Sequence, residues 1–128
     1  MNGDRGQALV LAVLALGLAA ATIVGLQAAQ ERIFHDAHER RAGEAAVEAA
    51  GAALADAQIG FTGSLTDFAA DPLVAERARA AADQLSALND GAAVRDLSIT
   101  ADAREIEVGL SVGVHRQRAA VETTCCRP

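Results

Sequence analysis

Residues 8–26 read ALVLAVLALGLAAATIVGL, an uninterrupted apolar run near the start of the chain. The run has no charged residue, and Thr22 is its only polar side chain. As an α-helix it would be roughly 28 Å long, close to the hydrocarbon thickness of a bilayer. Inside a soluble domain such a helix would need apolar partners on every side, and the rest of a 128-residue chain cannot supply them. We therefore predict a transmembrane helix over residues 8–26.

A cleavable secretory signal is the main alternative for this run. Ala19, Ala20 and Ala21 resemble the small residues of a cleavage site. The run is longer than the roughly 7–15 apolar residues of such signals, and before it Arg5 is offset by Asp4. Cleavage here would release a small secreted αβ domain, and we prefer the uncleaved membrane helix.

The helical pattern continues after the apolar run. Residues 27–59 are rich in Ala, Glu and Arg and contain no proline. Arg40 and Glu44 are four residues apart, a spacing that supports an exposed helical face. We predict one N-terminal helix over residues 7–59, roughly 80 Å long, whose part beyond residue 26 is an extramembrane rod.

Small residues give this rod a smooth face. Gly43 and Gly51 weaken the helix locally, so they indicate a bend or a close contact. The alanines suit packing against a helix or a sheet, and they are Ala42, Ala45, Ala46, Ala49 and Ala53.

Residues 60–128 are expected to form a small αβ head with a loose tail. Residues 60–70 suggest a break in the helix, with Phe61, Leu65 and Phe68 as possible anchors onto the rod. A second, short helix should follow. Its N-cap is Asp71, Pro72 is its first residue, and it runs to Leu88 before Asn89-Asp90-Gly91. The predicted apolar face of this helix consists of Leu73, Val74, Ala78, Ala81, Leu85 and Leu88.

Strict alternation over residues 104–114 predicts a half-buried strand. Residues 94–100 are a weaker partner strand, with Leu97 and Ile99 inward, and residues 101–103 link the two in an antiparallel hairpin. A hairpin alone is unstable in water, so it should lie on the helices. Residues 116–128 are either a third strand or a loose tail. The predicted inner face of the main strand consists of Ile106, Val108, Leu110, Val112 and Val114. The fold class is therefore α+β.

The composition argues against most binding and catalytic classes. The net charge of −6 leaves no basic surface for nucleic acid. No phosphate-binding glycine loop or Ser-His-Asp set is present, so we expect no catalytic residue, no cofactor, no nucleic-acid partner and no small-molecule substrate. His35 and His38 with Glu31 and Glu39 lack the spacing of a zinc motif, and we expect no metal site.

Two small features remain as candidate contacts between chains. Gly17, Ala21 and Gly25 recur every four residues, so one stripe of the apolar helix would let another helix approach closely. Cys125 and Cys126 are the only cysteines, and outside the cytoplasm one of them could form an intermolecular disulfide.

The N-terminal half resembles a known group of proteins. A leader ending in Arg5-Gly6 is followed by QALVLAVLALGLAAATIVGL and a charged helix, which is similar to type IV pilin-like proteins. Gln30-Glu31-Arg32, Arg40-Arg41-Ala42 and EAAVEAA at residues 44–50 resemble the TadE/TadG-like proteins of Tad (Flp) pilus loci and the PilX-like minor pilins. The resemblance covers roughly residues 5–58.

The resemblance implies a single-pass protein of a bacterial cytoplasmic (inner) membrane, with its N-terminus in the cytoplasm and its head outside. Residues 1–6 would be a leader that prepilin peptidase cuts between Gly6 and Gln7. Major pilins have a Glu five residues after the cut, where this chain has Leu11. The difference favours a minor or tip pilin, or an uncut TadG-like assembly protein. The implied partners are the membrane and other pilin-like subunits or pilus assembly proteins, with incorporation into a pilus as one outcome.

Overall fold

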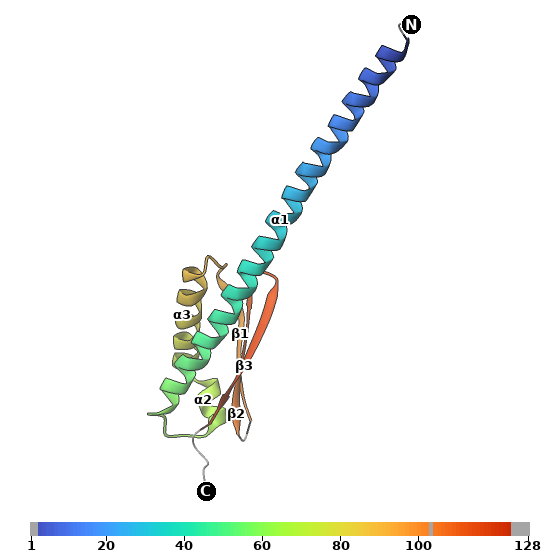
Figure 1. The fold of residues 1–128 in the computed structure, drawn as a ribbon. Helices are drawn as coiled ribbons and strands as arrows, with labels where there is room; N and C mark the ends of the chain where they lie inside the picture. The colour runs from blue at the N-terminus through green and yellow to red at the C-terminus, as the bar shows by residue number, and fades with distance from the viewer. Residues whose placement is uncertain (1–2, 103, 124–128) are drawn as a thin grey trace. The chain divides into compact units, whose positions relative to one another are not determined.

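A computed structural model describes residues 3–102 and 104–123, with side chains from Gly6 onward. The chain forms two compact units, Met1–Asp36 and Ala37–Pro128. The second unit is the head, and it contains the last part of the first helix and all later elements. The elements in chain order are α1 (Gly3–Gln58), α2 (Leu65–Ala70), α3 (Pro72–Leu88), β1 (Val94–Ala101), β2 (Glu105–Val112) and β3 (His115–Glu122) (Figure 1). The α+β fold class predicted from the sequence is confirmed.

The long N-terminal helix is present, and it begins earlier than predicted. α1 starts at Gly3 instead of Gln7 and ends at Gln58. No proline separates the leader from the apolar run, so the sequence has no strong signal that would start the helix only at Gln7. The leader residues therefore join the helix that follows them.

The predicted break after α1 contains a short helix that the sequence analysis missed. The Ser64 hydroxyl caps α2 by accepting a hydrogen bond from the Asp67 backbone N–H at 3.1 Å. Phe68 of α2 is fully buried, and its ring meets that of Phe61 edge to face at 5.1 Å between centroids. Two of the three predicted anchors thus form an aromatic pair, and the third, Leu65, packs against the core.

The ends of α3 agree with the prediction. The Asp71 carboxylate accepts a hydrogen bond from the Leu73 N–H at 2.8 Å, as an N-cap should. At the other end the chain turns at Asp90, whose φ is 55°, and the Gly91 N–H donates to the Ser86 carbonyl at 2.9 Å. A side chain at Gly91 would run into Ser86, so this position requires glycine.

The buried face of α3 differs from the predicted apolar face. Val74 and Ala78 are buried as expected, but Leu73 and Leu88 are 64% and 72% exposed. The face that packs consists of Val74, Ala78, Ala82 and Ser86. These are mostly small residues at intervals of four, which allow close packing against the neighbouring elements, and the leucines at the helix ends lie outside that contact.

The sheet has three antiparallel strands in the order β1-β2-β3. β2 pairs with β3 in continuous register from Glu105↔Glu122 to Val112↔His115. The choice between a third strand and a tail is thus settled in favour of a strand over residues 115–122. Residues 124–128 lie outside the described part.

A β-bulge in β1 sets which residues face inward. The register shifts between Arg95 and Ser98, and Asp96 has a φ of 53°. The extra residue moves the inward positions of β1 from even to odd numbers, so Val94 is buried before the bulge and Leu97 and Ile99 are half-buried after it. The predicted inward residues of this strand are confirmed.

The turn between β2 and β3 corrects the prediction for Val114. Gly113 has a φ of 58° and occupies the first central position of a two-residue turn, the pattern of a type II′ hairpin. Val114 is the second turn residue and is 85% exposed. The alternation that predicted it to be buried ends at Val112, because the chain leaves the sheet there.

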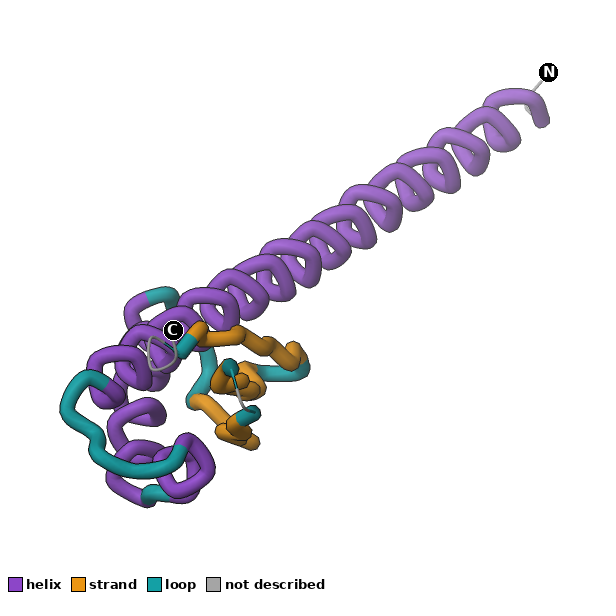
Figure 2. Tube along the Cα trace, turned by 90° about the horizontal axis from the view of Figure 1, so that it is seen from below, coloured by secondary structure: helices purple, strands orange, loops and turns teal. Residues whose placement is uncertain are grey.

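The inner face of the sheet packs against the helices (Figure 2), and this layer contains the core. Gly43 and Gly51 mark a close contact and not a bend, since a side-chain Cβ would lie 3.1 Å from Gln117 at the first and 3.4 Å from Val121 at the second. The alanine face predicted for the rod is buried at some positions and half-buried at others. The core consists of Ala42, Ala46, Val47, Ala50, Leu54, Phe68, Val74, Ala78, Ala82, Val94, Ile106, Val108, Leu110 and Val112.

Candidate functional site

The first unit offers a continuous apolar surface. Every described side chain from Gly6 to Asp36 is exposed, and α1 is long and apolar enough there to cross a membrane. Apolar side chains this large and this numerous are unfavourable in water and favour a lipid or protein environment. The bulky exposed residues are Leu9, Val10, Leu11, Val13, Leu14, Leu16, Leu18, Ile23, Val24, Leu26, Ile33 and Phe34.

The single polar side chain of residues 8–26 has its hydrogen bond within the helix. The Thr22 hydroxyl donates to the Leu18 carbonyl oxygen at 2.8 Å. In a bilayer an unsatisfied hydroxyl costs free energy, and a bond to the carbonyl four residues earlier removes that cost. The segment is therefore compatible with lipid at each of its described side chains.

The small residues of the predicted packing stripe lie on this exposed helix. A Cβ added at Gly17 or Gly25 would meet nothing within 4 Å, and Ala21 between them is exposed. The stripe is thus open along its whole length. Close approach of a second helix stays a prediction.

The predicted processing site lies in the first turns of α1. Gly6 and Gln7 are exposed, and nothing lies within 4 Å of a Cβ built at Gly6. Leu11, at the position where major pilins have Glu, is 61% exposed. Cys125 and Cys126 fall outside the described residues, so the predicted disulfide is untested.

The residues weighed as metal ligands do not form a cluster. Within residues 3–102 and 104–123, no group of three or more His, Cys, Asp or Glu side chains is arranged to hold a metal ion. His35, His38 and Glu31 are exposed, and Glu39 is half-buried.

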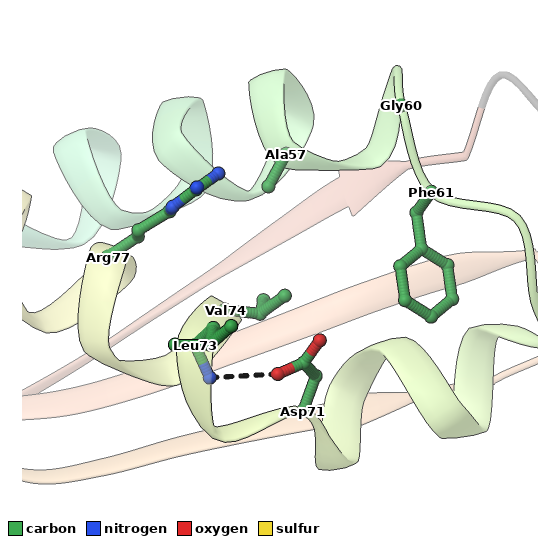
Figure 3. Close-up of a pocket in the computed structure, with 7 residues that line it drawn as sticks. All are labelled: Ala57, Gly60, Phe61, Asp71, Leu73, Val74 and Arg77. Atoms are coloured by element: carbon green, nitrogen blue, oxygen red, sulfur yellow. Dashed lines mark hydrogen bonds between the residues drawn. The ribbon is translucent and has the colours of Figure 1, made fainter.

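A small hollow lies between the end of α1 and the start of α3 (Figure 3). Its volume is about 230 Å³, and Ala57, Phe61 and Val74 form much of its wall. Asp71 also lines it, but its carboxylate is engaged in capping α3. Arg77 is the other charged residue of the lining. A single arginine beside an apolar wall does not make a catalytic arrangement.

The face of the sheet away from the helices carries polar side chains that the sequence analysis did not treat as a site. Glu107 on β2 and Arg118 on β3 form an ion pair at 3.4 Å, and both are exposed at their side chains. Glu105 and Glu107 alternate with the buried residues of β2 and therefore share its polar face, and the arginines of β3 join them only through strand pairing. The sequence did not indicate this face because it depends on the register between β2 and β3, which the sequence of a single strand does not reveal.

Comparison of the chain with models of protein families, with curated proteins and with solved structures finds no match. The function is therefore inferred from the residues themselves. They offer a lipid-compatible helix, a compact head and a polar sheet face.

Proposed function

We propose that this chain is a structural, non-enzymatic, pilin-like protein of a Tad or type IV pilus apparatus. The apolar segment of α1 holds it in the cytoplasmic membrane of a bacterium, with the N-terminus in the cytoplasm and the head outside. It acts through helix packing and protein–protein contacts, with other pilin-like subunits or assembly proteins as partners.

The main observation behind the proposal is a difference within α1: the apolar residues before Asp36 are exposed, whereas the later part of the helix has a buried apolar stripe in the head. That stripe consists of Ala42, Ala46, Val47, Ala50 and Leu54. The head completes its core with residues 42–112 and does not use residues 6–36. A chain of this design needs an external apolar environment for its N-terminal segment. Membrane lipid supplies that environment for a single subunit, and neighbouring helices supply it in a fibre.

The leader and the residues after it support the proposal that the protein is pilin-like. Gly6-Gln7 precedes the apolar run directly, as the resemblance requires. Leu11 places no carboxylate in the membrane, where a charge would be costly. The subunit therefore needs no charged partner at that depth, which favours a minor subunit over a major one.

An uncut membrane-anchored assembly or interaction module of a secretion system is the second candidate. Leu11 favours it too, because a chain that never enters a fibre has no use for the carboxylate. The two candidates differ in whether residues 1–6 are removed.

The test is the intact mass of the chain, purified from membranes of cells with and without a prepilin peptidase. We expect loss of residues 1–6 only when the peptidase is present. Gly6→Val should block the loss, and Gly25→Val is its matched control, since both glycines are equally open. A full-length mass in both strains would favour the uncut module, and an N-terminus near Thr22 would indicate a secreted domain.

A further inference from the structure

The two edges of the sheet differ in how their backbone groups are used. β1 forms one edge and β3 forms the other. An edge strand directs half of its N–H and C=O groups away from the sheet, where another strand can bind them. Proteins commonly close such an edge with a bulge, with charged side chains or with a covering element. In this sheet only the edge at β1 is closed in such a way.

The edge of β1 is closed by a bulge and by side chains of α3. The Val94 N–H donates to Asp83 Oδ1 at 2.8 Å, and the Val94 carbonyl accepts a hydrogen bond from Arg79 Nη1 at 3.4 Å. The bulge at Asp96, whose φ is 53°, then interrupts the straight row of backbone groups. An incoming strand would meet an irregular and partly occupied backbone, so β1 is a poor template.

The edge of β3 is regular. β3 pairs with β2 from His115 to Glu122 without a bulge. Residues that flank a two-residue turn form a hydrogen-bonded pair, and such pairs alternate along the strands with pairs that are not hydrogen-bonded. The bond from the Thr123 N–H to the Arg104 carbonyl, at 3.2 Å, fits this alternation. The outward-directed N–H and C=O groups of β3 therefore belong to Arg116, Arg118, Ala120 and Glu122.

These outward-directed groups are accessible. All four residues are exposed, and no hydrogen bond within residues 3–102 and 104–123 joins their backbone to another element. The ion pair of Arg118 with Glu107, at 3.4 Å, directs the arginine over the sheet and away from the edge. The middle of β3 then has only the small side chain of Ala120 beside its open backbone. Such an edge is a template for a further strand.

We propose that the free edge of β3 binds an extended segment of a partner protein as a fourth, antiparallel strand. Antiparallel pairing is slightly more stable per residue than parallel pairing. Main-chain hydrogen bonds to the outward-directed residues hold the segment, and side chains select it. The register spans seven partner residues, from position 1 opposite Glu122 to position 7 opposite Arg116.

The charges of β3 select the outer-facing residues of the partner. Glu122 lies directly across from Glu105, and like charges in this position disfavour the pair. A basic residue at position 1 relieves that repulsion. Arg116 has no ion pair within the described residues, and a carboxylate at position 7 supplies one. The partner segment is therefore basic at its start and acidic at its end.

The inner-facing residues of β3 select apolar residues of the partner. Val121 and Ala119 pack against the core and are only half-buried. Apolar side chains at positions 2 and 4 lie opposite them and extend the apolar side of the sheet. Because Ala119 is small, position 4 has room for a β-branched residue, which suits a strand.

A second copy of the chain does not suit this edge. The charges of β3 would also match those of another β3 in antiparallel order. Gly43 lies against Gln117 and Gly51 against Val121, so the head part of α1 runs in the same direction as β3. Antiparallel β3 strands would send the two α1 helices in opposite directions, which does not suit chains anchored in one membrane. This exclusion rests on the proposed function.

The test adds the synthetic peptide KVTVTTE, acetylated and amidated, to the full-length chain in detergent micelles. Backbone amide hydrogen exchange is followed by NMR. We expect saturable slowing of exchange at the outward N–H groups of Arg118 and Ala120, and none at those of Ile99 and Ala101 on β1. The peptide EVTVTTK has the same composition with its two charges exchanged, and it should bind about tenfold more weakly.

A proline in β3 tests the backbone part of the contact. Ala120→Pro removes one outward N–H and no bond to β2, and an edge strand tolerates proline where its N–H faces solvent. It should weaken binding of KVTVTTE about tenfold and leave the thermal unfolding of the head nearly unchanged. Ala101→Pro removes an outward N–H from the β1 edge and is the matched control, which should bind like the wild type.

A charge reversal tests the side-chain part of the contact and does not depend on the proline variant. Arg116→Glu changes an exposed residue, so the fold should be unaffected. This variant should prefer the peptide KVTVTTK to KVTVTTE, the reverse of the wild-type preference. An unchanged preference would mean that Arg116 does not face the partner segment.

Several outcomes would overturn the proposal. They are the absence of saturable protection, protection at the β1 edge instead, and equal binding by the Ala120→Pro variant. A dimer of the peptide-free chain that Ala120→Pro dissociates in sedimentation velocity would also overturn it, because a second copy would then occupy the edge.

The outcomes separate this inference from the proposed function. Removal of residues 1–6 without peptide binding would keep the pilin-like role and overturn the β3 contact. Peptide binding by a chain that is never cut would keep the β3 contact and overturn the processed pilin.

Discussion

Residues 8–26 and residues 42–54 belong to the same helix and are both rich in alanine, yet their surroundings are opposite. The first segment carries leucine, valine and isoleucine around its circumference, and all of its side chains are exposed. The second has a buried stripe of small residues against the sheet, with Glu44 and Glu48 exposed on its other side. Burial within the chain is therefore decided by the size of the side chains and their distribution around the helix, and not by total hydrophobicity.

The largest expected effect is on the stability of the sheet that packs against residues 42–54. Val108 is fully buried, so Val108→Asp should lower the free energy of unfolding of the head by roughly 4 kcal/mol. Val114→Asp is the control, because that side chain is 85% exposed and should be nearly neutral. Urea unfolding followed by circular dichroism would measure both. Equal effects would mean that the strand register described above is wrong.

A charge within residues 8–26 should change membrane insertion and not the stability of the head. Leu16→Arg, near the middle of residues 8–26, should disfavour membrane insertion by about 3 kcal/mol, because a guanidinium is costly at the bilayer centre. Carbonate extraction of membranes would show the loss, and the unfolding of the head should not change. Ala52→Arg, at an exposed position of the same helix within the head, should leave insertion intact. Unchanged extraction of the Leu16 variant would argue against a membrane-spanning segment.

A bulkier residue should disturb the buried stripe. Ala46 is fully buried, and Ala46→Leu should destabilise the head by about 2 kcal/mol through overpacking. Ala52→Leu adds the same atoms on the exposed side and should cost little. Thermal unfolding of the two variants in parallel gives the comparison. A neutral Ala46→Leu would indicate that the helix does not lie as close to the sheet as Gly43 and Gly51 imply.

The smallest effect is expected for the open stripe. Gly17→Leu with Ala21→Leu should leave the stability of the head unchanged and weaken association of α1 helices by about 1 kcal/mol, since bulky side chains prevent close approach. Crosslinking in membranes would report the association. Leu9→Ala with Leu16→Ala, away from the stripe, is the control. Unaltered crosslinking of the glycine variant would show that the stripe is no interface.

The parts of the fold that were predictable have a strong period or a clear boundary signal. α1 contains no proline over its whole length, β2 alternates strictly, and Asp71-Pro72 begins α3. α2 was missed because Leu65–Ala70 is too short for a helical period to be recognised. The bulge at Asp96 and the turn at Gly113 depend on backbone conformations that residue hydrophobicity does not report.

The candidate sites were predictable to a smaller degree. The apolar segment and its small-residue stripe were visible in the sequence, because each lies within one helix. The charged outer face was not, because Arg116 and Arg118 meet Glu107 only when β3 pairs with β2. A property shared by several strands requires their register, and no local pattern in this chain encodes it.

The bond between Thr22 and Leu18 has a mechanical consequence. Since the hydroxyl is satisfied by its own helix, the apolar segment holds no polar group that requires a fixed neighbour. Turning such a helix about its axis in lipid breaks no hydrogen bond along residues 8–26, whereas sliding it out of lipid exposes its apolar side chains to water and is opposed by that free-energy cost. In lipid the segment is therefore free to rotate, while its depth is fixed by its apolar side chains.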